Sequence, residues 1–160
     1  MHTSVHTFAS ALALIGTTVP DHLMAEAEVP VLTGPQAQGD LLIVPCATPG
    51  GAEPESWRPV GAAGIQVVRG EATGNTHWLH AGFDSPGVEW RPVAGHLTYG
   101  SLRVPDGQSA LLIHTDEHGA NGIGPGTYEI RGKRELAFGD PTRVVNRVTP
   151  DRQPWSRVLD

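Results

Sequence analysis

The sequence predicts a mainly all-β fold: a small β-barrel or jelly-roll sandwich with a short N-terminal helix and an extended C-terminal arm. The 160 residues include 20 glycines and 14 prolines, and only 18% are charged. Short apolar runs alternate with turn-forming clusters along most of the chain. This alternation is typical of small β-sandwiches and barrels. A chain of this length fits one domain.

The first expected element is a short amphipathic helix. Its apolar residues recur at helical spacing and form one stripe. The stripe consists of Val5, Phe8, Ala9, Leu12 and Ala13. Thr3 or Ser4 is the expected N-cap and Gly16 the expected end. A helix this short is marginal alone, so its stripe must pack on the chain's own body or on a neighbouring subunit.

The strands are expected from residue 40 onward. A second helical turn is predicted between Asp21 and Glu26, and the segment from Val29 to Gly39 is predicted to be irregular because prolines and glycines interrupt it. The apolar or alternating runs that follow predict strands at 41–44, 65–68, 76–80, 88–91, 96–104, 110–114 and 127–131. Gly100 marks a plausible bulge, and residues 47–63 and 119–126 are predicted to be loops.

These elements divide the chain into three parts. Residues 1–37 form an N-terminal helix and arm, residues 38–138 form the β core, and residues 139–160 form a C-terminal arm. The last part contains three prolines and little periodicity, which is typical of a tail. We expect Val5, Phe8, Leu12, Trp155, Val158 and Leu159 to contact neighbouring subunits.

Composition excludes several classes of protein. The formal net charge of -6 argues against nucleic-acid binding, which needs clustered Lys and Arg. The basic residues Arg131, Lys133 and Arg134 are flanked by Glu129 and Glu135, a pattern that favours a solvated strand face. The single cysteine permits no intrachain disulfide, and the apolar run from Phe8 to Ile15 is too short to span a bilayer. A cytoplasmic origin, and no membrane partner, are expected.

Histidines form the densest group of candidate ligands. His77 and His80 belong to one predicted strand, and His114 and His118 surround the end of another. Neutral imidazole binds divalent transition metals. A three-ligand site from His77, His118 and either His114 or His80 is therefore one interpretation. The competing interpretation is that these are hydrogen-bonded histidines at polar strand ends.

Several short motifs occur in an order that resembles a small, largely uncharacterised family of actinobacteria and their phages. The run Gln38-Gly39-Asp40 opens an apolar strand, GEATGNTH is similar to the family's GE-x-TGH-x-H motif, and DEH at 116–118 resembles its EEH element. PGTY at 125–128 and Arg134-Glu135 complete the resemblance, which spans roughly residues 38–136. The histidine pair of that family resembles the first pair of cupins, which implies a small cupin-like barrel and a possible metal.

The sequence departs from this resemblance at one ligand position. Asn75 stands where the family has its first histidine, while His77 and His118 match. An amide is a poor ligand for such metals compared with imidazole. The departure therefore suggests a retained fold with weakened metal chemistry.

Known catalytic patterns are missing. The chain has no G-x-S-x-G motif, and its glycine-rich run at 122–126 lacks the Lys-Ser/Thr of a phosphate-binding loop. Cys46 lies in an apolar context without an adjacent base, so no thiolate nucleophile is expected.

Three functions remain open from the sequence. The leading interpretation is a non-enzymatic structural protein that forms homo-oligomers or binds a capsid-type lattice, most concretely a phage capsid decoration or cement protein in the virion, with no cofactor. The alternative is a cupin-type metal-binding protein, a sensor or minor enzyme, that uses His77 and His118. A third is an accessory binding domain that presents Trp57, Trp78 and Trp90.

Overall fold

The computed structural model describes residues 5–47, 57–69, 76–93, 98–114, 118–136 and 155–157. For Arg69 and the last two strands only the backbone is described. The elements are α1 (Phe8–Ala13), β1 (Val31–Leu32), β2 (Gln36–Gln38), β3 (Leu41–Pro45), β4 (Arg58–Pro59), β5 (Ile65–Arg69), β6 (Thr76–Ala81), β7 (Glu89–Pro92), β8 (Thr98–Val104), β9 (Ala110–His114), β10 (Ala120–Ile123), β11 (Gly126–Gly132), β12 (Arg134–Leu136) and β13 (Trp155–Arg157).

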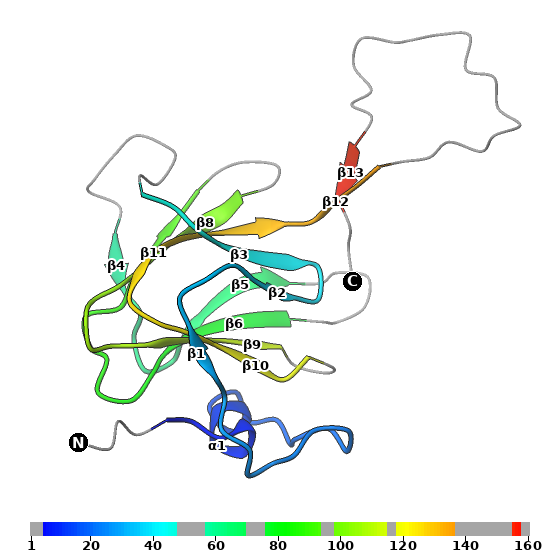
Figure 1. The fold of residues 1–160 in the computed structure, drawn as a ribbon, viewed down its shortest axis with the longest axis vertical. Helices are drawn as coiled ribbons and strands as arrows, with labels where there is room; N and C mark the ends of the chain where they lie inside the picture. Colours follow the sequence, from blue (N-terminus) through cyan, green and yellow to red (C-terminus); the bar gives the residue numbers. More distant parts are fainter. Residues whose placement is uncertain are drawn as a thin grey trace, which may run out of the picture.

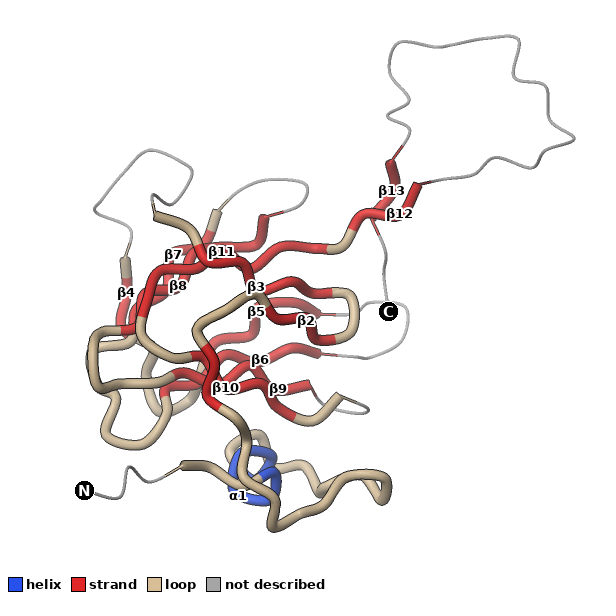
Figure 2. The backbone as a smooth tube through the Cα atoms, in the orientation of Figure 1, coloured by secondary structure: helices blue, strands red, loops and turns tan. Residues whose placement is uncertain are grey.

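Two sheets make up the body of the molecule (Figures 1 and 2). One has five strands in the order β1-β10-β9-β6-β5, and the other has six in the order β2-β3-β11-β8-β7-β4. All pairings within them are antiparallel except that of β1 with β10. The predicted all-β class is confirmed. The strands described in the body of the molecule form two separate sheets rather than one closed barrel.

The main core fills the space between the two sheets. Alternate residues of the strands point inward, as the period of two requires. Leu79 and Leu112 from the five-stranded sheet meet Leu41, Ile43 and Ile130 from the six-stranded sheet, and all five are fully buried. The core therefore depends on residues from both halves of the described chain.

Helix α1 covers the outer face of the five-stranded sheet. A capping box starts it: the Ser10 backbone N–H donates to Thr7 Oγ1 at 3.1 Å, and the Thr7 N–H donates to Ser10 Oγ at 3.0 Å. The cap is thus Thr7, not Thr3 or Ser4, and Gly16 at φ 71° follows the helix as predicted. Leu12 packs with Leu111 and Ile113 of β9 in a second apolar cluster. Residues 21–26 form turns rather than a helix.

Sequence patterns missed six short strands: β1, β2, β4, β10, β12 and β13. Strands of two to four residues carry too little alternation for a pattern to detect. In β10 the glycines indicated a loop, but a Cβ on Gly122 would lie 2.4 Å from the Pro30 carbonyl oxygen. Glycine here permits the close approach of β1. Because β1 and β2 pair with the main sheets, part of the predicted arm at 1–37 belongs to the core.

A third, two-stranded ribbon stands apart from the sandwich. β12 pairs antiparallel with β13, and Arg134, Glu135 and Leu136 lie opposite Arg157, Ser156 and Trp155. Figure 1 shows this ribbon projecting from the end of β11, away from both sheets. Just before β12, the Lys133 backbone N–H donates to the Asp40 carbonyl at 2.8 Å and ties the root of the ribbon to the body.

Candidate functional site

The structure brings together three of the four histidines that the sequence singled out. His77 on β6 lies directly opposite His114 on β9, and their ring centroids are 4.4 Å apart. His118, just beyond β9, meets His114 edge-on with centroids 4.9 Å apart. His77 and His114 are buried and His118 is exposed. His80 is also buried but lies on the opposite face of β6, because three positions separate it from His77.

An amide from the opposite sheet fixes one nitrogen of His77. Gln38 Nε2 donates to the Leu112 carbonyl at 2.7 Å and to Asn121 Oδ1 at 2.9 Å, so the orientation of this amide is unambiguous. Gln38 Oε1 then faces His77 Nδ1 at 3.0 Å. Because that oxygen can only accept, His77 Nδ1 carries a proton and donates it.

A carboxylate faces the other nitrogen. His77 Nε2 lies 3.2 Å from Asp40 Oδ1, and the two side chains are only 2% and 4% exposed. This is an ion-pair separation, although the two atoms do not form a hydrogen bond with each other. Burial of both side chains favours an arrangement in which their charges cancel, because an uncompensated buried charge is costly.

The local sequence explains why Gln38 and Asp40 act together. They flank Gly39 in the tight turn between β2 and β3, and Gly39 has φ 56°, which an L side chain rarely adopts. The QGD motif therefore consists of a glycine that the turn requires and of two flanking side chains that both face His77. No sequence spacing connects this turn with His77 or with Asn121 on β10, so the network could not be predicted.

The arrangement differs from a metal site at His77. Both of its ring nitrogens face protein groups, so a metal ligand there requires one of these contacts to break. Among the described residues, no three His, Cys, Asp or Glu side chains are grouped so as to hold a metal ion. Asn75, Asp116 and Glu117 lie outside the described residues.

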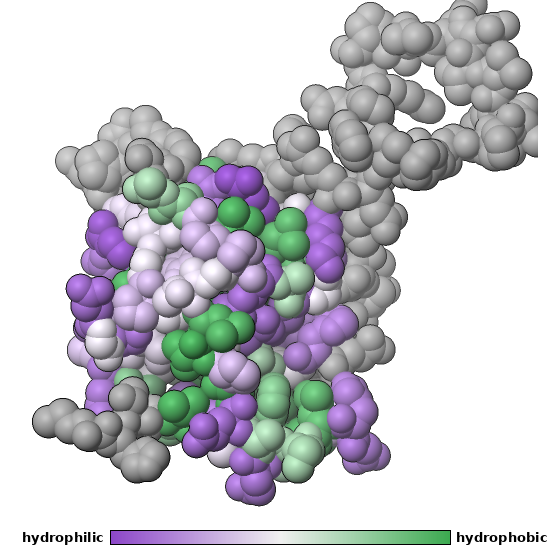
Figure 3. Space-filling model, in the orientation of Figure 1, coloured by the Kyte–Doolittle hydropathy of each residue, from purple (hydrophilic) through white to green (hydrophobic). Residues whose placement is uncertain are grey.

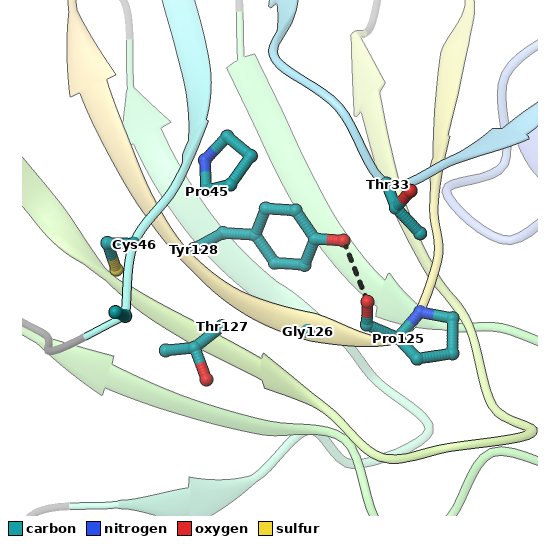
Figure 4. A pocket seen from close by; sticks show the side chains of 8 residues that line it. Thr33, Pro45, Cys46, Pro125, Gly126, Thr127 and Tyr128 are labelled. Carbon is teal, nitrogen blue, oxygen red and sulfur yellow. Dashed lines mark hydrogen bonds between the residues drawn. The ribbon is translucent and has the colours of Figure 1, made fainter.

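Apart from the histidines, a hollow of about 350 Å³ lies between the loop after β3 and the start of β11 (Figure 4). The Tyr128 hydroxyl donates a hydrogen bond to the Gly124 carbonyl at 2.8 Å. Burial raises the pKa of this hydroxyl. Burial, reinforced by Glu129, also raises the pKa of the Cys46 thiol, which keeps it protonated at neutral pH. Both shifts disfavour the ionised forms of these two groups.

The predicted interface residues have different positions. Leu12 is 1% exposed and packs on the chain's own sheet, with Phe8 partly buried beside it, whereas Ala13 of the same stripe is exposed. Val5 is half-buried. Trp155 is part of β13, of which only the backbone is described. Val158 and Leu159 lie outside the described residues.

The three tryptophans do not form a common exposed surface. Trp90 is a core residue, and Trp78 packs in the cluster beneath α1. Trp57 is half-buried, with the guanidinium groups of Arg103 and Arg91 at 4.4 and 5.3 Å from its ring centroid. No helix among the described residues is long and apolar enough to cross a membrane.

Comparisons with known proteins bear on the family alone. No curated protein and no solved structure matches the chain. The model of a domain of unknown function, DUF8820, matches residues 37–133. This stretch runs from β2 through β11 and includes the QGD turn, His77, His114 and His118. Because the match covers more than half of the sequence, the chain belongs to the DUF8820 family.

Proposed function

We propose that the protein is a non-enzymatic structural component of a larger symmetric assembly, most concretely a capsid decoration or cement protein of a phage. The observation that carries this proposal is the β12–β13 ribbon, which lies outside both sheets (Figure 1). An isolated two-stranded ribbon is marginally stable in water, and among the described residues neither strand pairs with anything but the other. Contact with another copy supplies what the ribbon lacks.

The surroundings of the ribbon support the same role. The buried network of Gln38, Asp40 and His77 joins the two sheets next to the point where Lys133 is hydrogen bonded to Asp40. Because the chain is already fixed where the ribbon begins, binding through the ribbon requires little further ordering of the backbone at that point. The motif resemblance to a family of phages and their hosts makes a capsid the most concrete partner.

The test is removal of residues 151–160, which deletes β13 but leaves α1 and both sheets intact. Size-exclusion chromatography with light scattering should show an oligomer for the full chain and a monomer for the truncated chain. Met24→Ser is the matched control, because Met24 is a 77% exposed apolar residue far along the chain from the ribbon. An unchanged mass after truncation, together with unchanged binding to capsid particles, would refute the proposal.

A second candidate, a metal-binding protein, rests on the succession of His77, His114 and His118. It predicts stoichiometric zinc, iron, copper or nickel in untagged protein, and loss of that metal in both His77→Ala and His118→Ala. His22→Ala, at an exposed histidine, is the control. Elemental analysis that finds no metal in the untagged protein removes this candidate.

A further inference from the structure

A hollow on the outer side of the five-stranded sheet has its own chemistry, separate from the network around His77. It consists of two cavities, of about 240 and 480 Å³, that share Leu14 and His80 as lining residues. The larger volume falls within the roughly 300–1,000 Å³ typical of small-molecule sites. The turn at residues 61–64 runs between them, with Ala63 lining one cavity and Ala62 the other.

His80 is a buried polar group of this hollow. It is 3% exposed, and its Nε2 has no hydrogen-bond partner among the described residues. The edge of the ring that carries Nε2 lies against Gly64, where an added Cβ would be 2.3 Å from Nε2. A buried polar atom without a partner is costly. A ligand that supplies the missing hydrogen bond would recover that cost.

The surroundings keep His80 uncharged. Burial lowers the pKa of its imidazole. The pKa of the neighbouring His6 is also lowered, first by burial and then by His80 itself. A neutral imidazole has one nitrogen that donates and one that accepts a hydrogen bond.

The rest of the lining defines the ligand. Leu14, Val60, Ala81 and Pro86 are apolar. Ser85 also lines the cavity, but its hydroxyl already donates to the Phe83 carbonyl at 2.8 Å and accepts from the Ser109 N–H at 2.9 Å. The exposed carboxylate of Asp84 at the rim disfavours anions. An apolar body with one donor group therefore fits best.

We propose that the hollow beside His80 binds a small uncharged molecule with an apolar body and one hydroxyl or N–H group, which donates a hydrogen bond to the imidazole. Binding moves the turn at 61–64 outward, because Gly64 covers Nε2 in the present arrangement. The turn can do so since its ends are glycines and its centre is two alanines, and the Gly64 N–H donates to the Gly61 carbonyl within the turn at 2.9 Å. The site does not depend on the assembly role proposed above.

The test uses phenol and indole as probes and benzene as the ligand without a polar donor. Titration of the full chain, followed by ¹⁵N spectra of the histidine rings and backbone amides, should shift the imidazole of His80 and the amide of Gly64. Phenol should bind roughly two- to tenfold more tightly than benzene, the ratio expected for one neutral hydrogen bond.

Two variants locate the binding. Ala62→Phe narrows the hollow from an exposed position and should abolish the shifts. Ala47→Phe, at another exposed alanine, which lines the cavity near Tyr128, should leave them unchanged. In His80→Leu, phenol and benzene should bind with equal affinity, because the hydrogen-bond acceptor is gone. The proposal is overturned if no probe shifts His80 at its solubility limit, if benzene binds as tightly as phenol to the unaltered chain, or if Ala47→Phe abolishes binding and Ala62→Phe does not.

Discussion

Gln38→Met tests whether the buried amide network holds the two sheets together. Methionine keeps the approximate length of the side chain but removes both hydrogen bonds from Nε2 and the one that Oε1 accepts from His77. The substitution removes the acceptor of the buried His77 Nδ1–H and the bonds to the Leu112 carbonyl and to Asn121 Oδ1. Loss of the acceptor for the buried donor costs about 1–3 kcal/mol and each of the other two bonds about 1 kcal/mol, and the added apolar burial offsets about 1 kcal/mol. We therefore expect a loss of about 3 kcal/mol in the free energy of unfolding.

The matched control is Gln36→Met, two residues earlier on the same strand. Gln36 also binds across the sheets, to the Gly122 carbonyl and to Asn121, but it is only half-buried. Its loss should cost about 1 kcal/mol. Urea unfolding, followed by tryptophan fluorescence at constant m, measures both values. The reasoning is refuted if Gln38→Met costs no more than Gln36→Met.

Three further predictions concern the helix, one glycine and pH. Leu12→Ala should lower the free energy of unfolding by about 2–5 kcal/mol, because it leaves a cavity in the cluster beneath α1. Leu14→Ala, at a 42% exposed residue, should lower it by less than about 1 kcal/mol. Equal losses in urea unfolding would contradict the packing of α1 on the sheet. Gly64→Ala should lower the melting temperature more than Gly107→Ala does. Both glycines have positive φ (70° and 75°), but of these two only Gly64 has a residue, His80, within reach of an added Cβ. An equal drop in the melting temperature of the two variants would contradict that contact. His6 and His80 have lowered pKa values in the folded chain, so the unfolded chain takes up their protons first as pH falls below 6.5. Stability should therefore fall with pH in that range, and His80→Leu should reduce the slope; a slope unchanged by this variant would show that His80 contributes nothing to it.

The long strands were predictable because each carries a local pattern, either a continuous apolar run or an alternation of apolar and polar residues. Leu41–Pro45, Thr76–Ala81 and Ala110–His114 all lie within a residue of the predicted strands. Gly100 marked a real irregularity, since the register between β8 and β11 shifts beside it. The short strand β10 was missed because the glycine that admits β1 looks like a loop residue in the sequence.

The candidate site was only partly predictable. Proximity of His77 and His114 follows once two strands pair in register, and both residues had been singled out. The partners of His77 come from 37 and 39 positions earlier in the chain, through contacts between sheets that no local pattern encodes. His80 had been grouped with the others, but strand alternation places it on the opposite face, where burial and Gly64 give it a different environment.

The most direct measurement of the central claim is amide hydrogen exchange in β12 and β13 as a function of protein concentration. If the ribbon is completed by another copy, the amides of residues 134–136 and 155–157 should be protected at high concentration and exchange rapidly when dilution gives monomers. Protection that does not change with concentration, or no protection at any concentration, would contradict the assignment of this ribbon as an assembly arm.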